Sequence, residues 1–238
     1  MRIQPLFNVF RRTRQISLAF LCAALVLLMA LPALAKEDPT LADLSDSEIA
    51  RIHAGEILVD VEQGDDINRG VIVGIIQNPI NDVVPYVARC WEYAPWRDNI
   101  SDTKLERRID DDTIVCSGTA NTPFPASDRD GHFRVLNHTT TVEGERAFVS
   151  LFEYIEGSGN LEDMYGYWVL TPYGENNEHT LLKHVLNVDL GSWIPSFLIR
   201  WATRRTLPAT IWGIRKELKQ PGDGRSEPLY WEDYDYRQ

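Results

Sequence analysis

The sequence is short of positive charge and of the motifs that mark common enzyme classes. Its 238 residues include 24 Lys and Arg against 35 Asp and Glu, which gives a net charge of -11. That balance argues against a binder of duplex nucleic acid, because affinity for the phosphate backbone depends on clustered basic side chains. No H-E-x-x-H, P-loop, G-x-S-x-G or dinucleotide-binding motif occurs, and no cysteine pair has metal-ligand spacing. We therefore expect no metal, no cofactor and no nucleic-acid partner.

Apolar and aromatic surface is what the chain has in quantity. Hydrophobic residues make up 44% of it and aromatic residues 10%, with seven Trp among them. A chain of this length covers such large side chains only by folding around them. One domain of about 200 residues is the expectation.

The first 35 residues differ in composition from the rest. Residues 1–14 carry four Arg and no acid, an apolar run covers 16–34, and residues 33–35 have the A-x-A form of a cleavage site. This pattern predicts a signal peptide over 1–35 and export to the periplasm of a Gram-negative bacterium. A retained N-terminal membrane anchor is the alternative, since the apolar run nearly spans a bilayer. Without these four Arg the chain has 20 basic and 35 acidic residues.

Two cysteines, Cys90 and Cys116, follow the leader in the sequence. Export would place them in a compartment that permits disulfides. A bridge between them would close a loop of about 26 residues and contribute roughly 3 kcal/mol by the chain-entropy estimate. Two small buried thiols are the alternative, and the sequence leaves both open.

The hydrophobic pattern predicts helices at both ends of a long run of strands. Residues 45–48 have the form of a capping box, which starts a short helix that ends near residue 55. Further helices are predicted at 79–90 and 194–218, and strands at 57–62, 70–77, 104–109, 113–121, 132–142, 146–155, 165–171 and 180–188. Residues 221–238 form an acidic and aromatic tail.

This element order predicts an α+β fold. Short turns between the strands favour an antiparallel meander. The long C-terminal helix must then cross the concave face of a curved sheet, because no other predicted element can cover that face. Such an arrangement encloses either a packed core or a cavity.

Three segments in register resemble the motifs of a known family. They are Pro123-Phe124-Pro125-Ala126-Ser127-Asp128-Arg129-Asp130, Gly166-Tyr167-Trp168-Val169-Leu170-Thr171-Pro172 and Val188-Asp189-Leu190-Gly191-Ser192-Trp193-Ile194-Pro195. In order and spacing they resemble START lipid-transfer domains of the SRPBCC, or helix-grip, superfamily, in its exported bacterial type. The resemblance covers about residues 44–220. It implies a START-like helix-grip domain over 36–220 with an internal hydrophobic cavity, a lipid or other hydrophobic ligand, no cofactor and a monomeric state.

The motif residues have structural roles in this interpretation: Arg129, Asp130, Trp168, Asp189, Gly191 and Pro195. Arg129 and Asp130 would pair with each other or with loop backbone. Gly191 and Pro195 suit the corner that leads into the last helix, where Asp189 could accept from free N–H groups.

Relatives with sterol-like ligands often bury an arginine a few residues after the Arg-Asp signature. Val135 holds that position in this chain, and Arg134 falls on the opposite face of the strand. We therefore expect a more apolar pocket, or a polar anchor from another strand.

Alternation along the strands and the helix supplies candidates for the wall of a cavity. They are Phe133, Val135, Phe148, Phe152, Tyr154, Tyr167, Val169, Phe197, Leu198, Trp201, Ile211 and Trp212, with Ile194 at the start of the helix. A plain packed core is the alternative for these stripes. A register error of one residue would invert the faces of a strand.

The last predicted helix gathers positive charge within an acidic chain: Arg200, Arg204, Arg205, Arg215 and Lys216. Transient contact with anionic lipid headgroups is one interpretation, since each basic residue near such a surface contributes about 1 kcal/mol. A solvated face that complements the helix dipole is the other.

The sequence thus predicts a protein, not an enzyme, that binds a lipid in the periplasm and transfers or senses it. A cyclase or hydrolase on the same fold is the alternative, with His132 or His184 as the acid or base. A protein-interaction module with a filled core is a third possibility.

Overall fold

The computed structural model describes residues 36–64, 67–122, 127–189 and 196–219, with the backbone alone at residues 63 and 196–203. The helices are α2 (Asp46–His53), α3 (Ile80–Ala88), the 3-10 helix η1 (Cys90–Glu92) and α4 (Ser196–Leu218). The strands are β1 (Leu58–Gln63), β2 (Asn68–Ile76), β3 (Ile100–Arg108), β4 (Thr113–Ala120), β5 (Arg129–Val142), β6 (Glu145–Tyr154), β7 (Asp163–Tyr173) and β8 (His179–Asp189). The predicted leader and tail lie outside the described residues.

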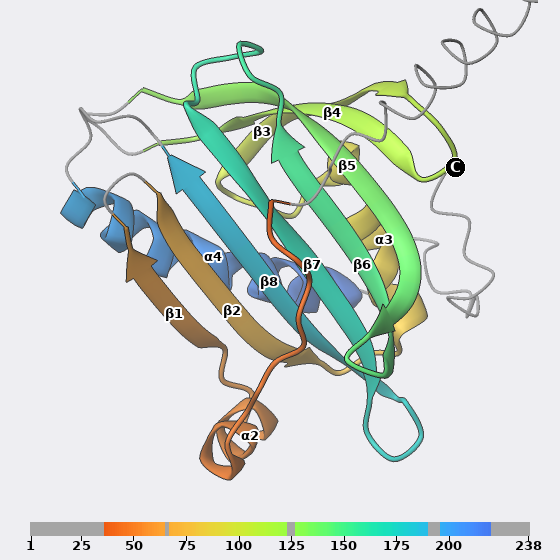
Figure 1. Ribbon diagram of the computed structural model, residues 1–238. Helices are drawn as coiled ribbons and strands as arrows, with labels where there is room; N and C mark the ends of the chain where they lie inside the picture. The colour runs from red at the N-terminus through yellow and green to blue at the C-terminus, as the bar shows by residue number, and fades with distance from the viewer. Residues whose placement is uncertain (1–35, 65–66, 123–126, 190–195, 220–238) are drawn as a thin grey trace, which may run out of the picture. The chain divides into compact units, whose positions relative to one another are not determined.

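The strands form one antiparallel sheet in the order β1-β2-β8-β7-β6-β5-β4-β3. Strands β3 to β8 follow one another as a meander, and the β1–β2 hairpin joins it where β2 pairs with β8. Helix α4 runs along one face of this curved sheet (Figure 1). The predicted α+β fold, with an antiparallel sheet that grips a C-terminal helix, is confirmed.

The local sequence explains where α2 begins. Ser45 is its N-cap, and its backbone N–H donates to Glu48 Oε2 at 2.9 Å while its hydroxyl accepts from the Glu48 N–H. This is the predicted capping box, which satisfies two N–H groups that a helix start leaves free.

Helices α3 and α4 cover the same face of the sheet and bury the main core against it. The core includes Ile72 and Ile76 of β2, Val83 and Val87 of α3, Phe148 of β6, Leu170 of β7, and Leu207, Ile211 and Ile214 of α4. Helix α4 approaches the loop before β3 so closely at Gly213 that a Cβ there would overlap the backbone oxygen of Trp96. No helix within the described ranges is long and apolar enough to span a membrane.

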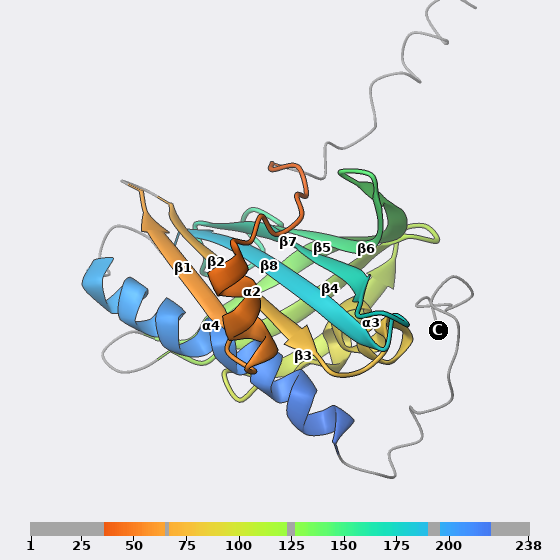
Figure 2. The ribbon, with the colours of Figure 1, turned by 90° about the horizontal axis from the view of Figure 1, so that it is seen from below.

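Residues 36–45, which we call the strap, cross the opposite face of the sheet over β7 and β8 (Figures 1 and 2). Glu37 pairs with Arg69 at 2.8 Å, and Lys183 donates to the backbone oxygen of Leu41 at 2.9 Å. The Leu41 side chain packs on a second buried cluster that includes Tyr167. Both faces of the central strands are therefore covered, one by helices and the other by the strap.

Candidate functional site

A cavity of about 230 Å³ lies between the helix-covered face of the sheet, the η1–β3 loop and α4. Most of its described lining is apolar: Phe133, Val135, Phe152, Leu161, Met164, Trp168, Leu186 and Val188. Enclosed apolar hollows with a few polar groups are the usual form of a small-molecule site. This cavity is the candidate ligand site.

A larger hollow, of about 740 Å³, lies on the other face between the strap, α2 and the β1–β2 hairpin. Charged side chains line it, among them Glu48, Arg51, Arg69 and Lys183. A hydrophobic ligand placed there would desolvate those charges without pairing them. We therefore assign a hydrophobic ligand to the smaller cavity.

Two strands place predicted wall residues at the cavity. Phe133 and Val135 of β5 and Phe152 of β6 line it. Phe148, also predicted, lies in the main core. Tyr154 packs on Phe133, with ring centroids 5.9 Å apart, and its hydroxyl accepts from the Gly159 N–H at 3.0 Å. It supports the wall without being among the lining residues.

The prediction for β7 is wrong by one residue. Tyr167 and Val169 were assigned to the cavity, but both lie in the cluster under the strap on the opposite face. Trp168, expected to be structural only, lines the cavity, and so does Met164. Hydrophobic alternation could not tell the two faces of β7 apart, because the strap buries one face and the helices bury the other, so both faces are apolar.

The prediction for α4 is partly wrong. Ile211 lies in the core rather than at the cavity, and Trp212 points to solvent with 55% of its surface exposed. Trp212 stands one position past the buried Ile211, which turns it about 100° away around the helix. Thr206 is the α4 residue that lines the cavity within the described part of the helix.

Four predicted wall residues cannot be placed in this way. Phe197, Leu198 and Trp201 fall where the structure describes the backbone alone, and Ile194 precedes α4 in a segment outside the described residues. Their assignment to the cavity stays a prediction.

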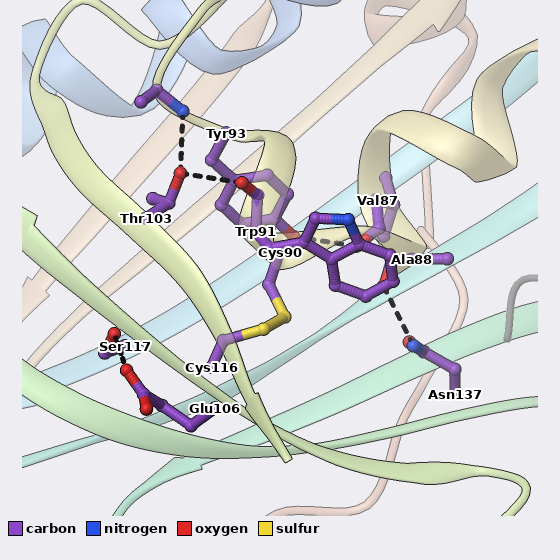
Figure 3. The surroundings of a disulfide bond; sticks show 11 residues. Val87, Ala88, Cys90, Trp91, Tyr93, Thr103, Glu106, Cys116, Ser117 and Asn137 are labelled. Atoms are coloured by element: carbon purple, nitrogen blue, oxygen red, sulfur yellow. Dashed lines mark hydrogen bonds between the residues drawn. A yellow bond between two sulfur atoms is a disulfide. The ribbon is translucent and has the colours of Figure 1, made fainter. Parts of the chain in front are cut away.

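Cys90 and Cys116 both line the cavity, and they form a disulfide, which Figure 3 shows with its neighbours. It ties the turn after α3 to β4. Hydrogen bonds brace the same turn: Tyr93 donates to the Val87 oxygen at 2.7 Å, and Thr103 donates to the Trp91 oxygen at 3.0 Å. Burial raises the pKa of Tyr93 to about 12, so this hydroxyl stays neutral and keeps its donor.

His184 of β8 lines the cavity as a neutral ring. It stacks on Trp168 with ring centroids 3.7 Å apart and planes 8° apart, and Nδ1 lies 3.1 Å from the Tyr167 oxygen. A carbonyl oxygen only accepts, so Nδ1 carries the proton and Nε2 is left as an acceptor. Burial, with a smaller effect from Arg97, lowers the pKa of His184 to about 3. Such a ring is a weak base at neutral pH.

Arg97 is a charged lining residue that sequence reasoning missed. It lies on the loop between η1 and β3, and its guanidinium carbon is 5.3 Å from the centroid of the Tyr93 ring. Burial lowers the pKa of Arg97. The expected alternatives were an apolar pocket or a polar anchor from another strand; the structure has a mainly apolar pocket with an arginine from a loop. No periodicity marks this position, because loops have none.

The Arg-Asp signature divides between two environments. Arg129 is buried, lines the cavity and donates to the backbone oxygen of Ser127 at 2.9 Å. Asp130 is exposed, and its backbone N–H donates to Asn160. Of the two predicted pairings, contact with loop backbone is the one observed for Arg129.

The remaining motif residues lie at the edge of the described chain. Asp189 ends β8 and pairs in register with Asp163 of β7. Gly191 and Pro195 lie outside the described residues, so the predicted corner before α4 is not described. Arg134, one place from Val135, forms an ion pair with Glu153 at 2.8 Å.

The basic residues of α4 do not all face outward. Arg204, Arg205 and Lys216 are exposed. Arg215, predicted to face a membrane, instead donates to the backbone oxygens of Gly55 and Ile75, which draws its guanidinium inward. The side chain of Arg200 is not among those described. No cluster of His, Cys, Asp and Glu that could hold a metal occurs in the described ranges.

No protein-family model matches the sequence, and no curated protein matches it. Solved structures do match in fold. A STAR-related lipid transfer protein from Xanthomonas axonopodis superposes with a TM-score of 0.55 at 17% identity, over 68% of this chain and 99% of its own. Human StAR-related lipid transfer protein 5 superposes with a TM-score of 0.54 at 15% identity, over 68% of this chain and 86% of its own. Human STARD10 superposes with a TM-score of 0.53 at 12% identity, over 80% of this chain and 85% of its own.

These matches agree with the geometry. Each covers most of this chain and most of the matched chain, and the shared arrangement is a curved antiparallel sheet with a C-terminal helix across it. Identity this low is informative about fold alone. The chain has a START-like helix-grip fold.

Proposed function

We propose that the protein binds one hydrophobic small molecule, a lipid, in the cavity and carries or senses it. The observation that supports this is an apolar hollow of about 230 Å³ placed between sheet and helix in a START-like fold. The matched solved structures include proteins named as lipid transfer proteins. A ligand that moved about 250 Å² of apolar surface out of water would gain roughly 6 kcal/mol.

Native mass spectrometry of the protein purified from its host tests this proposal. We expect a population of the protein with one lipid adduct, which extraction and fragmentation would identify. Protein that emerges empty, and that takes up none of the lipids extracted from its own host, would count against binding.

Binding is favoured over catalysis by the state of the polar groups at the cavity. His184 is held neutral, with a pKa near 3, and it is stacked on Trp168. His132, the other candidate base, lies on the opposite face of β5 from Phe133 and Val135, since neighbouring residues of a strand point to opposite sides. A cyclase or hydrolase remains the alternative activity; turnover that His184→Gln abolishes would support it.

We further propose that the protein is exported and works in the periplasm. The leader sequence and the Cys90–Cys116 disulfide support this together, because disulfides persist in oxidising compartments. Sequencing of the mature N-terminus should give Lys36. A chain that keeps residues 1–35 in the membrane fraction would indicate an anchor instead.

Transient contact with an anionic membrane is proposed for the exposed side of α4. At 3.6 residues per turn, Arg204, Arg205, Trp212 and Lys216 fall within about a third of the helix circumference. Basic residues around an exposed Trp suit an anionic interface, where the ring sits at headgroup level.

Vesicle sedimentation tests the membrane contact. Binding to vesicles with anionic lipid should fall as salt is added, and it should be lost in Arg204→Glu plus Arg205→Glu. The matched control is Arg51→Glu plus Lys104→Glu, which makes the same charge change at exposed residues of α2 and β3. Vesicle binding that does not change with salt would argue against membrane docking through α4. So would an equal loss of binding in the α4 double variant and in the control double variant.

A further inference from the structure

Arg97 holds a positive charge at the wall of an apolar cavity. The loop fixes its position, because the Arg97 N–H donates to the Tyr93 oxygen at 2.9 Å and the Ile100 N–H donates to the Arg97 oxygen at 2.9 Å. Its guanidinium carbon lies 5.3 Å from the Tyr93 ring and 5.9 Å from the Trp96 ring. Its side chain is partly accessible and is among the residues that line the cavity.

That charge has no acidic partner among the described residues. Arg69, Arg89 and Arg134 each form an ion pair with a glutamate, whereas none is formed by Arg97 in this part of the chain. The Nε atom of Arg97 is buried without a hydrogen-bond partner. A buried charge is normally paired, since desolvation otherwise costs several kcal/mol in general.

The rest of the described lining adds no negative charge. No Asp or Glu is among the described lining residues of the cavity. Burial first, and the Arg97 charge second, lower the pKa of His184, whose ring stacks on Trp168 at the same cavity. The described lining therefore presents the charge of Arg97 with no acidic side chain beside it, inside a chain whose net charge is -11.

The geometry points to an anionic ligand: we propose that the cavity binds a single-chain amphiphile whose carboxylate or phosphate end pairs with Arg97. A guanidinium presents paired N–H donors that match both anions. The volume favours one chain over two, because 230 Å³ is close to the roughly 300 Å³ that a single ten-carbon chain needs at ~30 Å³ per methylene-sized group. This inference rests on the proposed lipid-binding function and specifies the charge of the ligand.

Four ten-carbon probes test it by titration calorimetry on the purified protein: decanoate, decyl phosphate, decanol and decyltrimethylammonium. We expect the two anions to bind the unaltered protein roughly 10- to 100-fold more tightly than decanol, which is the range of one charge-assisted pair. The cation should bind more weakly than decanol. The ratio of decanoate to decyl phosphate then separates a fatty-acid ligand from a phosphate-bearing one.

Arg97→Met should remove the preference for anions and leave decanol binding as tight as before, because Met keeps the apolar stem. Arg134→Met is the matched control, since that arginine lies on the opposite face of β5 and pairs with Glu153. Control and unaltered protein should give the same affinities. Decanoate binding that survives Arg97→Met unchanged would overturn the inference.

The comparison among probes on the unaltered protein holds even if Arg97→Met fails to fold. Decanol that binds as tightly as both anions refutes the anion site and leaves the proposed hydrophobic binding intact. If none of the four probes binds, and protein purified from the host carries no lipid, the proposed function itself is refuted.

Discussion

Removal of the Cys90–Cys116 disulfide should cost the fold about 3.5 kcal/mol. The two cysteines are 26 residues apart, and the chain-entropy relation converts a loop of that size to this value at 25 °C. Both sulfurs are buried beside the cavity, with the cysteines 7% and 2% exposed, so reduction also loosens one wall of the candidate site. For a domain of about 200 residues this corresponds to a fall in Tm of roughly 7–14 °C.

Urea unfolding with and without a phosphine reductant measures the effect. The free energy of unfolding should fall on reduction of the unaltered protein. The double variant Cys90→Ala plus Cys116→Ala should already be destabilised and should not respond to the reductant. If reduced and oxidised proteins differ by less than about 1 kcal/mol, the loop-closure reasoning is wrong for this chain.

Three further perturbations follow from the packing. Gly213→Ala would press a methyl group into the Trp96 backbone and should destabilise by roughly 1–3 kcal/mol in urea unfolding, whereas Gly118→Ala, whose Cβ would meet Thr103 at 3.4 Å, should cost less. Between pH 6.5 and 5 the free energy of unfolding should fall by up to about 2 kcal/mol more for the unaltered protein than for His184→Gln. The reason is that the pKa of His184 is lowered in the folded state, so the unfolded chain takes up a proton that the folded chain does not. Equal losses in the two proteins would contradict the burial of that ring. Leu41→Ala should destabilise by roughly 1–2 kcal/mol through the strap and leave decanol affinity unchanged in calorimetry, and a changed affinity would mean that the strap reaches the cavity.

Element order was predictable because each element carries a local signal. Ser45 and Glu48 mark the start of α2, and short turns between alternating runs fix the meander. The helix on the sheet followed from the need to cover one apolar face. The junction of β2 with β8 is a long-range pairing for which no local pattern exists.

The wall of the cavity was predictable only where one face of a strand differs from the other. Phe133 and Val135 lie on β5, where the opposite face carries Arg134. On β7 both faces are apolar, so Tyr167 and Trp168 could not be told apart by periodicity. The strap that causes this ambiguity precedes the sheet and has no strand pattern of its own.

Arg97 shows a different limit of sequence reasoning. Its role depends on a loop that brings it to the cavity and on the absence of an acidic partner among the described residues, and neither follows from its neighbours in sequence. The expectation of a more apolar pocket, or of a polar anchor from another strand, was the closest available signal. It indicated that an anchor was possible without locating it.

The central claim is that a lipid occupies this cavity, and a cavity-filling variant tests it most directly. Val135→Trp would place an indole in the hollow, while Thr141→Trp adds the same side chain at an exposed position of the same strand. Lipid extracted per mole of protein, after purification of all three proteins from the same host, is the measurement. We predict about one lipid per chain for the unaltered protein and for Thr141→Trp, and a large loss for Val135→Trp. Equal lipid content in all three folded proteins would contradict the claim.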